Sequence, residues 1–294
     1  MKATRKFGAV VSFVVVLAAQ ASVSRADSLP FTTGLKLWLD ATQGVATSGS
    51  TVTGWADQSG NGHDGSYTSG APQLVPGAIN ALPAIGFNGA GDYFSLAGGA
   101  VLSSDSFTVF AVATDTSDSD SGPREIYSNW DAGNSWSSVF LGTSDGSDFA
   151  RSARFTDGFS ASEALNTPGS PFVVWGVYSG GVSAEMFVDN ASLGSAAQNN
   201  SPADIGNPNG QRDVSTPSFI GQQGSFSGEY WQGLIGEVLV YEGALTADQQ
   251  AEVYDYLYDK WFVVPEPSGC LLMTLALVGA FYARWRRRRV PRVA

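Results

Sequence analysis

A short loop of the sequence concentrates side-chain oxygens of the kind that bind calcium. Asp57, Asn61 and Asp64 fall within eight residues of one another, and Asp92 lies in a later Gly-Asp-Tyr loop. Hard cations prefer carboxylate and amide oxygens, and backbone carbonyls can complete the coordination shell. The pattern therefore offers a calcium site at Asp57, Asn61 and Asp64, with Asp92 as a second candidate. The alternative is structural, because Asp and Asn side chains also cap tight turns whose glycines take positive φ.

Three tryptophans stand beside asparagine or glutamine residues, a combination that suits sugar binding. Trp130, Trp136 and Trp231 are candidates for stacking on sugar rings, while the neighbouring amides would bind hydroxyl groups. The alternative is that these tryptophans pack in the core or between strands. The sequence alone does not choose between the two interpretations.

Catalytic patterns are not apparent. Glycoside hydrolysis needs two carboxylates held ~5 Å or ~6.5 to 9.5 Å apart. Five glutamates of the central region show no carboxylate partner at a matching spacing: Glu125, Glu163, Glu185, Glu229 and Glu237. His63 is the single histidine of the chain, which argues against Ser-His-Asp chemistry. We therefore expect a domain that is not an enzyme.

The charge of the central region restricts its partners. Residues 27–264 contain six Lys and Arg against 26 Asp and Glu, a net charge of −20, because most of the cations of the chain lie at its two ends. Such a surface repels phosphate groups, so nucleic acid and anionic lipid are not expected ligands. Neutral sugars and divalent cations remain. The only cysteine, Cys270, lies outside this region, so no disulfide stabilises it.

The elements that would position these residues are mostly strands. Short β-branched and aromatic runs separated by Gly, Ser, Asn and Asp are typical of an all-β sandwich or barrel. Segments 107–113 and 182–188 alternate in polarity, as half-buried strands do. One helix is expected after Thr246, where Thr246-Ala-Asp-Gln249 forms a capping box. An apolar stripe at Val253, Leu257 and Trp261 follows at helical spacing.

The N-terminus has the organisation of a secretory signal peptide. Lys2, Arg5 and Lys6 precede an apolar run over residues 7–19, and Ser24-Arg25-Ala26 ends in small residues. Cleavage between Ala26 and Asp27 would begin the mature protein at Asp27, so residues 1–26 are assigned to the signal peptide.

The C-terminus combines a proline hinge, an apolar run and an arginine cluster. Pro265, Glu266 and Pro267 precede an apolar segment that is uncharged over residues 269–283 and extends over residues 269–285 if Arg284 snorkels to the interface. The basic tail that follows contains Arg284, Arg286, Arg287, Arg288 and Arg289. Cationic flanks stay in the cytoplasm, so the residues before Pro265 are expected outside the membrane.

This C-terminal arrangement resembles the PEP-CTERM sorting signal of Gram-negative bacteria. The resemblance covers residues 263–294 and implies recognition by an exosortase, a membrane-embedded transpeptidase-like protease that removes the tail. Export through the inner membrane, transient anchoring there by a transmembrane helix, and release to the cell surface or extracellular matrix follow from it. The alternative is a generic single-span tail anchor.

The central domain, residues 27–262, resembles the laminin-G-like, concanavalin A-like jelly-roll superfamily. The segments that carry the likeness are Leu35 to Ala41, Trp55 to Gly65, Phe87 to Phe94 and Gly233 to Tyr241. The resemblance implies a two-sheet antiparallel jelly-roll sandwich closed by a C-terminal amphipathic helix. Lectins, adhesion modules and glycosidases share this fold, so it does not by itself assign an activity.

Together these patterns predict an exported, exosortase-sorted envelope or matrix protein with a non-catalytic module that binds extracellular polysaccharide. A structural or adhesive module that binds proteins is the first alternative, and a divergent glycoside hydrolase is the second.

Overall fold

The computed structural model describes residues 28–263, apart from residue 105 and residues 118–121, 130–138, 146–150, 156–168, 181–182, 198–215 and 225–227. Residues 26–264 form one unit. The expected signal peptide with its cleavage site at Ala26 and Asp27 lies outside the described residues. So do the Pro265-Glu266-Pro267 hinge, the apolar segment 269–285 and the arginine tail. Within the described residues, no helix is long and apolar enough to cross a membrane.

The described part of the chain contains sixteen strands and one helix. The strands are β1 (Leu35–Asp40), β2 (Val45–Ser48), β3 (Thr51–Trp55), β4 (Gly65–Ser69), β5 (Gln73–Ile79), β6 (Leu82–Asn88), β7 (Tyr93–Leu96), β8 (Phe107–Asp115), β9 (Arg124–Ser128), β10 (Phe140–Asp145), β11 (Arg151–Phe155), β12 (Pro171–Ser179), β13 (Ser183–Val188), β14 (Ala191–Ala197), β15 (Phe219–Ile220) and β16 (Gln232–Glu242). The helix is α2 (Ala247–Trp261).

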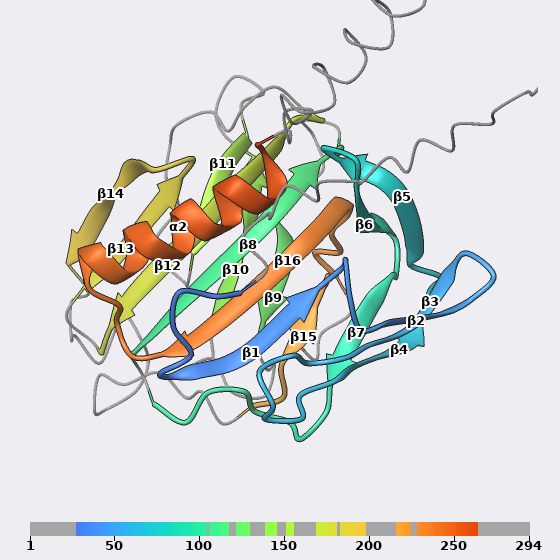
Figure 1. Ribbon diagram of the computed structural model, residues 1–294, viewed down its shortest axis with the longest axis horizontal. Helices are drawn as coiled ribbons and strands as arrows, with labels where there is room; N and C mark the ends of the chain where they lie inside the picture. Colours follow the sequence, from blue (N-terminus) through green and yellow to red (C-terminus); the bar gives the residue numbers. More distant parts are fainter. Residues whose placement is uncertain are drawn as a thin grey trace, which may run out of the picture. The chain divides into compact units, whose positions relative to one another are not determined.

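The strands pair antiparallel in one continuous order that bends back over itself. The order is β11-β10-β9-β15-β7-β4-β3-β5-β6-β16-β8-β12-β13-β14, with β1 added beside β16 and β2 beside β3. In Figure 1, β9 and β10 lie behind β8 and β16, while α2 crosses in front of β8 and β12. An antiparallel all-β domain with one helix is therefore confirmed.

The middle strands are buried on both faces. All nine residues of β8 are buried, so the expectation that segment 107–113 is half-exposed is wrong. The helix is the reason: Trp175 of β12 stacks on Phe110 of β8 at 5.5 Å and meets Tyr254 of α2 at 5.5 Å. β13, nearer the edge, keeps the expected alternation of buried and partly exposed residues.

The helix begins and docks as its sequence predicts. Thr246 accepts from the backbone N–H of Gln249, whose side chain accepts in turn from the backbone N–H of Thr246, so the capping box is formed. Val253, Leu257 and Trp261 are buried against the sheet. Burial of such a stripe is the main source of stability for a single surface helix.

The last turn of α2 carries a buried ionic network that the sequence did not reveal. Lys260 Nζ lies 2.6 Å from Asp40 Oδ2 and 2.8 Å from Glu237 Oε2. Glu237 also accepts hydrogen bonds from Trp261 Nε1 at 2.6 Å and Tyr256 OH at 2.8 Å. Burial raises the pKa of Glu237, and the positive charge of Lys260 opposes that rise. Glu237, which seemed to lack a carboxylate partner, thus shares one lysine with Asp40.

Candidate functional site

The Asp57 carboxylate organises its own loop. Oδ1 accepts from the backbone N–H groups of Trp38 at 3.0 Å and Ser59 at 2.9 Å. Oδ2 accepts from the backbone N–H of His63 at 3.0 Å and from Ser59 Oγ at 2.8 Å. Four donors saturate both oxygens, so Asp57 acts as a turn-forming residue.

The other calcium candidates are also engaged in local hydrogen bonds. Asn61 Nδ2 donates to the carbonyls of Leu35 at 2.9 Å and Lys36 at 3.1 Å, and Asp64 Oδ1 accepts from the backbone N–H of Asp57 at 2.8 Å. In the part of the chain that the structure describes, no three His, Cys, Asp or Glu side chains gather in a way that could hold a metal ion. The structural alternative accounts for this loop.

The prediction that the tryptophans stack on sugar rings is wrong for Trp231, the one of the three that lies within the described residues. Trp231 is fully buried, and its indole N–H points to the Leu234 carbonyl at 3.4 Å. Trp231 is therefore a core residue and cannot stack on a sugar. Trp130 and Trp136 lie outside the described residues.

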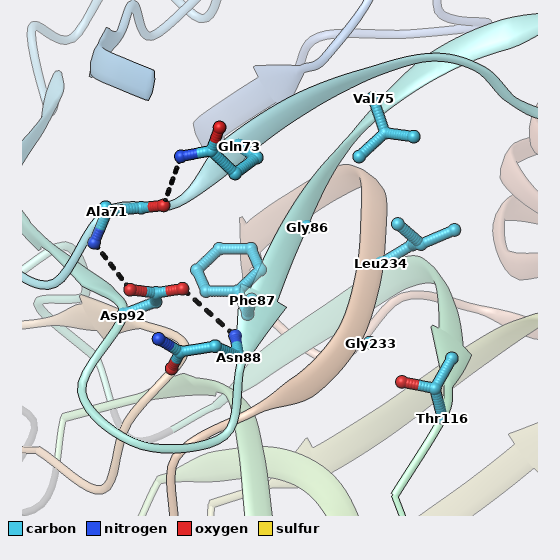
Figure 2. A pocket seen from close by; sticks show the side chains of 10 residues that line it. All are labelled: Ala71, Gln73, Val75, Gly86, Phe87, Asn88, Asp92, Thr116, Gly233 and Leu234. Atoms are coloured by element: carbon cyan, nitrogen blue, oxygen red, sulfur yellow. Dashed lines mark hydrogen bonds between the residues drawn. The ribbon is translucent and has the colours of Figure 1, made fainter. Parts of the chain in front are cut away.

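A groove of about 540 Å³ lies on the sheet where β5, β6 and β16 run side by side (Figure 2). Its lining comprises Ala71, Gln73, Val75, Gly86, Phe87, Asn88, Asp92, Thr116, Gly233 and Leu234. Gly86 creates the hollow, because a Cβ placed there would lie 3.3 Å from Val75 Cγ2 and 3.7 Å from Leu234 Cδ2. Gly86 pairs with Gln73 on one side and Leu234 on the other, so these three residues share one face.

The rim of the groove offers unpaired polar groups. Asn88 is exposed and its Oδ1 accepts from the backbone N–H of Ala90 at 2.8 Å, which leaves the Nδ2 donor without a partner among the described residues. Thr116 is also exposed, and its hydroxyl makes no hydrogen bond within the described part of the chain. Apolar walls at Val75 and Leu234 with neutral donors and acceptors above them suit an uncharged polyhydroxylated ligand.

Asp92 fixes the shape of this rim, and its carboxylate serves the fold rather than a metal. Oδ1 accepts from the backbone N–H of Ala71 at 2.6 Å, and Oδ2 accepts from the backbone N–H of Asn88 at 3.0 Å, as Figure 2 shows. Asp92 is only 2% exposed. One buried carboxylate therefore joins the loop before β5 to the end of β6.

Buried charges lie beside the groove, where β8, β9, β10 and β16 meet. Asp115, paired with Gly233 of the lining, accepts from Thr143 Oγ1 at 2.8 Å. Glu125 is fully buried and pairs with Gly142, the neighbour of Thr143. The structure thus brings two carboxylates into one region although ten residues of chain separate them. The spacing of Asp115 and Glu125 in the sequence matches no known catalytic motif, so the sequence did not predict that they lie close together.

Comparisons with solved structures show other proteins with a similar fold. Domain 4 of an extracellular arabinanase from Geobacillus stearothermophilus, solved with arabinotriose, is 15% identical with a TM-score of 0.54, and the match covers 76% of this chain and 97% of that one. An arabinofuranosidase solved with arabinofuranosyl-xylobiose is 16% identical with a TM-score of 0.56, covering 74% and 52%. Trypanosoma rangeli sialidase is 15% identical with a TM-score of 0.53, covering 77% and 33%. No protein-family model and no curated protein sequence matches the chain.

These comparisons contradict the expectation that the domain is not an enzyme. Solved structures with this fold include parts of an arabinanase, of arabinofuranosidases and of a sialidase, so the missing sequence pattern was not sufficient ground for excluding catalysis. At 15 to 16% identity the likeness shows the fold alone. The match spans about half of the arabinofuranosidase chain and a third of the sialidase chain, so it assigns neither protein's activity to this domain.

Proposed function

We propose that residues 27–262 form a laminin-G-like jelly-roll sandwich that binds a neutral polysaccharide in the groove centred on Gly86. The observation that carries the proposal is the groove itself. A glycine floor between Val75 and Leu234 leaves room for a ring, and the unpaired groups of Asn88 and Thr116 face its hydroxyls. The arabinanase domain solved with arabinotriose, which this chain covers almost completely, supports arabinose-containing glycans as the first ligands to test.

The ends of the chain support export and sorting. The basic and apolar N-terminus favours secretion with cleavage between Ala26 and Asp27, and the Pro265-Glu266-Pro267 hinge, apolar segment and arginine tail favour an exosortase as the processing partner. In this proposal the domain crosses the inner membrane, is anchored there briefly, and acts at the cell surface or in the extracellular matrix.

The test is a panel of immobilised neutral polysaccharides, including arabinan, probed with the full-length chain with and without calcium. Saturable binding to at least one neutral polymer, independent of calcium, is the expected result. Reducing ends are measured in the same wells, because steady release that Glu125→Gln abolishes would establish a glycosidase built on the buried carboxylates. Binding to envelope proteins with no binding to any glycan would contradict the proposal and support the adhesive alternative.

A further inference from the structure

Three buried ionisable side chains meet where α2 docks on the sheet, and the proposed glycan site uses none of them. Lys260 Nζ lies 2.6 Å from Asp40 Oδ2 and 2.8 Å from Glu237 Oε2. Lys260 is 7% exposed, Asp40 is 1% exposed and Glu237 is fully buried. Asp40 and Glu237 are direct partners across the β1–β16 pair, so one amine is held between two carboxylates. We call these three residues the lysine triad.

The two carboxylate oxygens of Asp40 have different surroundings. Oδ1 accepts from the backbone N–H of Thr42 at 2.8 Å and from Thr42 Oγ1 at 2.7 Å. Oδ2 contacts Lys260 Nζ and accepts from Gln43 Nε2 at 2.9 Å. If the amine attacked the carboxyl carbon, the two donors from Thr42 would stabilise the negative charge that develops on Oδ1. Oδ2 is then the oxygen that is placed to leave.

Glu237 is held in position to exchange protons with the amine. Its Oε2 lies 2.8 Å from Lys260 Nζ and also accepts from Trp261 Nε1 at 2.6 Å. Its Oε1 accepts from Trp38 Nε1 at 2.7 Å and from Tyr256 OH at 2.8 Å. Burial raises the pKa of Glu237, although the charge of Lys260 opposes the rise. A carboxylate with a raised pKa is a better proton acceptor than an ordinary one.

Aromatic rings surround the amine and keep the triad dry. Lys260 Nζ lies 5.5 Å from the ring centroid of Tyr256 and 5.4 Å from that of Trp261. A Cβ at Gly236 would lie 2.9 Å from the Trp261 ring, so glycine at this position lets the indole lie against β16. A buried ion pair carries a desolvation cost that the neutral amine and acid do not. The neutral amine is also the nucleophilic form of lysine.

We propose that Lys260 and Asp40 condense into an intramolecular amide bond, with Glu237 as the catalytic proton carrier. Glu237 takes one proton from the ammonium group, and the neutral Nζ attacks Cγ of Asp40. This proton and a second one from Nζ pass through Glu237 to Oδ2, which leaves as water. The third proton stays on the amide nitrogen, Oδ1 becomes the amide oxygen, and Glu237 is again a carboxylate. Nothing is oxidised or reduced.

The bond would join β1 to α2 across 220 residues of chain. A covalent cross-link that closes a long loop stabilises a domain by restricting its unfolded state. The only cysteine, Cys270, lies outside the central region, so the amide would supply the cross-link that a disulfide supplies in other exported domains. A chain that has not reacted keeps the ion network, so loss of Lys260 weakens the domain in both states. This inference is independent of the proposed glycan site.

The test is the mass of the purified full-length chain after denaturation, followed by peptide mapping. The wild type should weigh one water molecule less than its residues require, and the peptides that contain Asp40 and Lys260 should be recovered as one linked species. Lys260→Arg keeps a cation but offers no nucleophilic amine, so it should show the full mass. Lys36→Arg is the matched control, because Lys36 pairs with Glu242 in a partly exposed site. It should keep the loss of one water.

Two further variants assign the roles within the triad. Asp40→Asn should lose one ammonia in place of one water, because the leaving atom is then a nitrogen, and loss of water in this variant would show that Asp40 is not the electrophile. Glu237→Gln should keep the full mass while folded by circular dichroism, and a folded variant that still forms the bond would overturn the role of Glu237.

The wild-type mass decides the proposal even where a variant fails to fold. A wild-type chain of full mass with unlinked peptides would overturn it. A loss of water that persists in Lys260→Arg would overturn it as well, because that loss would arise elsewhere in the chain. One missing water in the wild type, with the link mapped to Asp40 and Lys260, supports it.

Discussion

Lys260 Nζ lies 2.6 Å from Asp40 Oδ2, so the last turn of α2 is joined to β1, which begins the sheet 220 residues earlier in the chain. Both side chains are almost completely buried. The same ammonium group also binds Glu237 in β16. The helix is therefore held to two strands by a charge whose loss would leave two carboxylates unpaired in the core.

Lys260→Met should destabilise the domain by about 3 to 5 kcal/mol, because removal of one partner leaves buried charge without compensation. The measurement is urea unfolding followed by fluorescence. Lys36→Met is the matched control: Lys36 pairs with Glu242 at 2.7 Å, but both side chains are partly exposed, so the cost should be about 0 to 1 kcal/mol. Equal effects of the two substitutions would show that the network does not stabilise the helix.

Leu257→Ala should cost about 2 to 5 kcal/mol, since Leu257 is 1% exposed and its removal leaves a cavity between helix and sheet. The neighbouring Tyr258 is 45% exposed, so Tyr258→Ala should change the free energy of unfolding by only about 0.5 kcal/mol. Both are measured in the same urea titration. A change of under about 0.5 kcal/mol for Leu257→Ala would mean that the helix is not packed as described.

The stability contribution of Glu242 should depend on pH. Burial favours a higher pKa, but hydrogen bonds from Lys36 and Ser103 outweigh it and hold the pKa of Glu242 below its ordinary value of 4.5. A carboxyl with a lowered pKa in the folded state stabilises the protein above the unfolded pKa, and this contribution disappears as the pH falls through the folded pKa. The wild type should therefore exceed Glu242→Gln in stability near neutral pH and converge with it in acid. A difference that stays constant with pH would contradict this account.

Calcium should not stabilise the Asp57 loop, because four protein donors already saturate that carboxylate. Thermal unfolding with excess calcium and with a chelator should give the same Tm. Asp57→Ala should cost about 1 to 3 kcal/mol by leaving backbone donors unsatisfied. A rise in Tm that requires calcium and is lost in Asp57→Ala would restore the metal-site interpretation.

The sequence predicts the elements of this fold better than it predicts the site. Periodicity and a capping box sufficed to locate α2, because those signals are local. Asp40, Glu237 and Lys260 lie far apart in the chain. Their contact depends on the tertiary structure, so no pattern in the sequence predicts it. The same holds for the groove: Gly86 and Asn88 give no sign of their role until β5 and β16 are placed beside β6. The prediction for Trp231 was wrong for a related reason: a tryptophan beside an amide side chain is compatible with both a buried core position and a sugar-binding site.

Binding of a neutral polysaccharide to the groove is the central claim, and a matched pair of glycine substitutions tests it most directly. Gly86→Val fills the hollow between Val75 and Leu234, whereas Gly54→Val places the same side chain on β3, where a Cβ would meet only ordinary contacts at 3.7 and 3.8 Å. Titration of both variants with the polysaccharide that the wild type binds should show binding lost in Gly86→Val and retained in Gly54→Val, with both proteins folded by circular dichroism. Undiminished binding by a folded Gly86→Val protein would contradict the assignment of the groove as the glycan site.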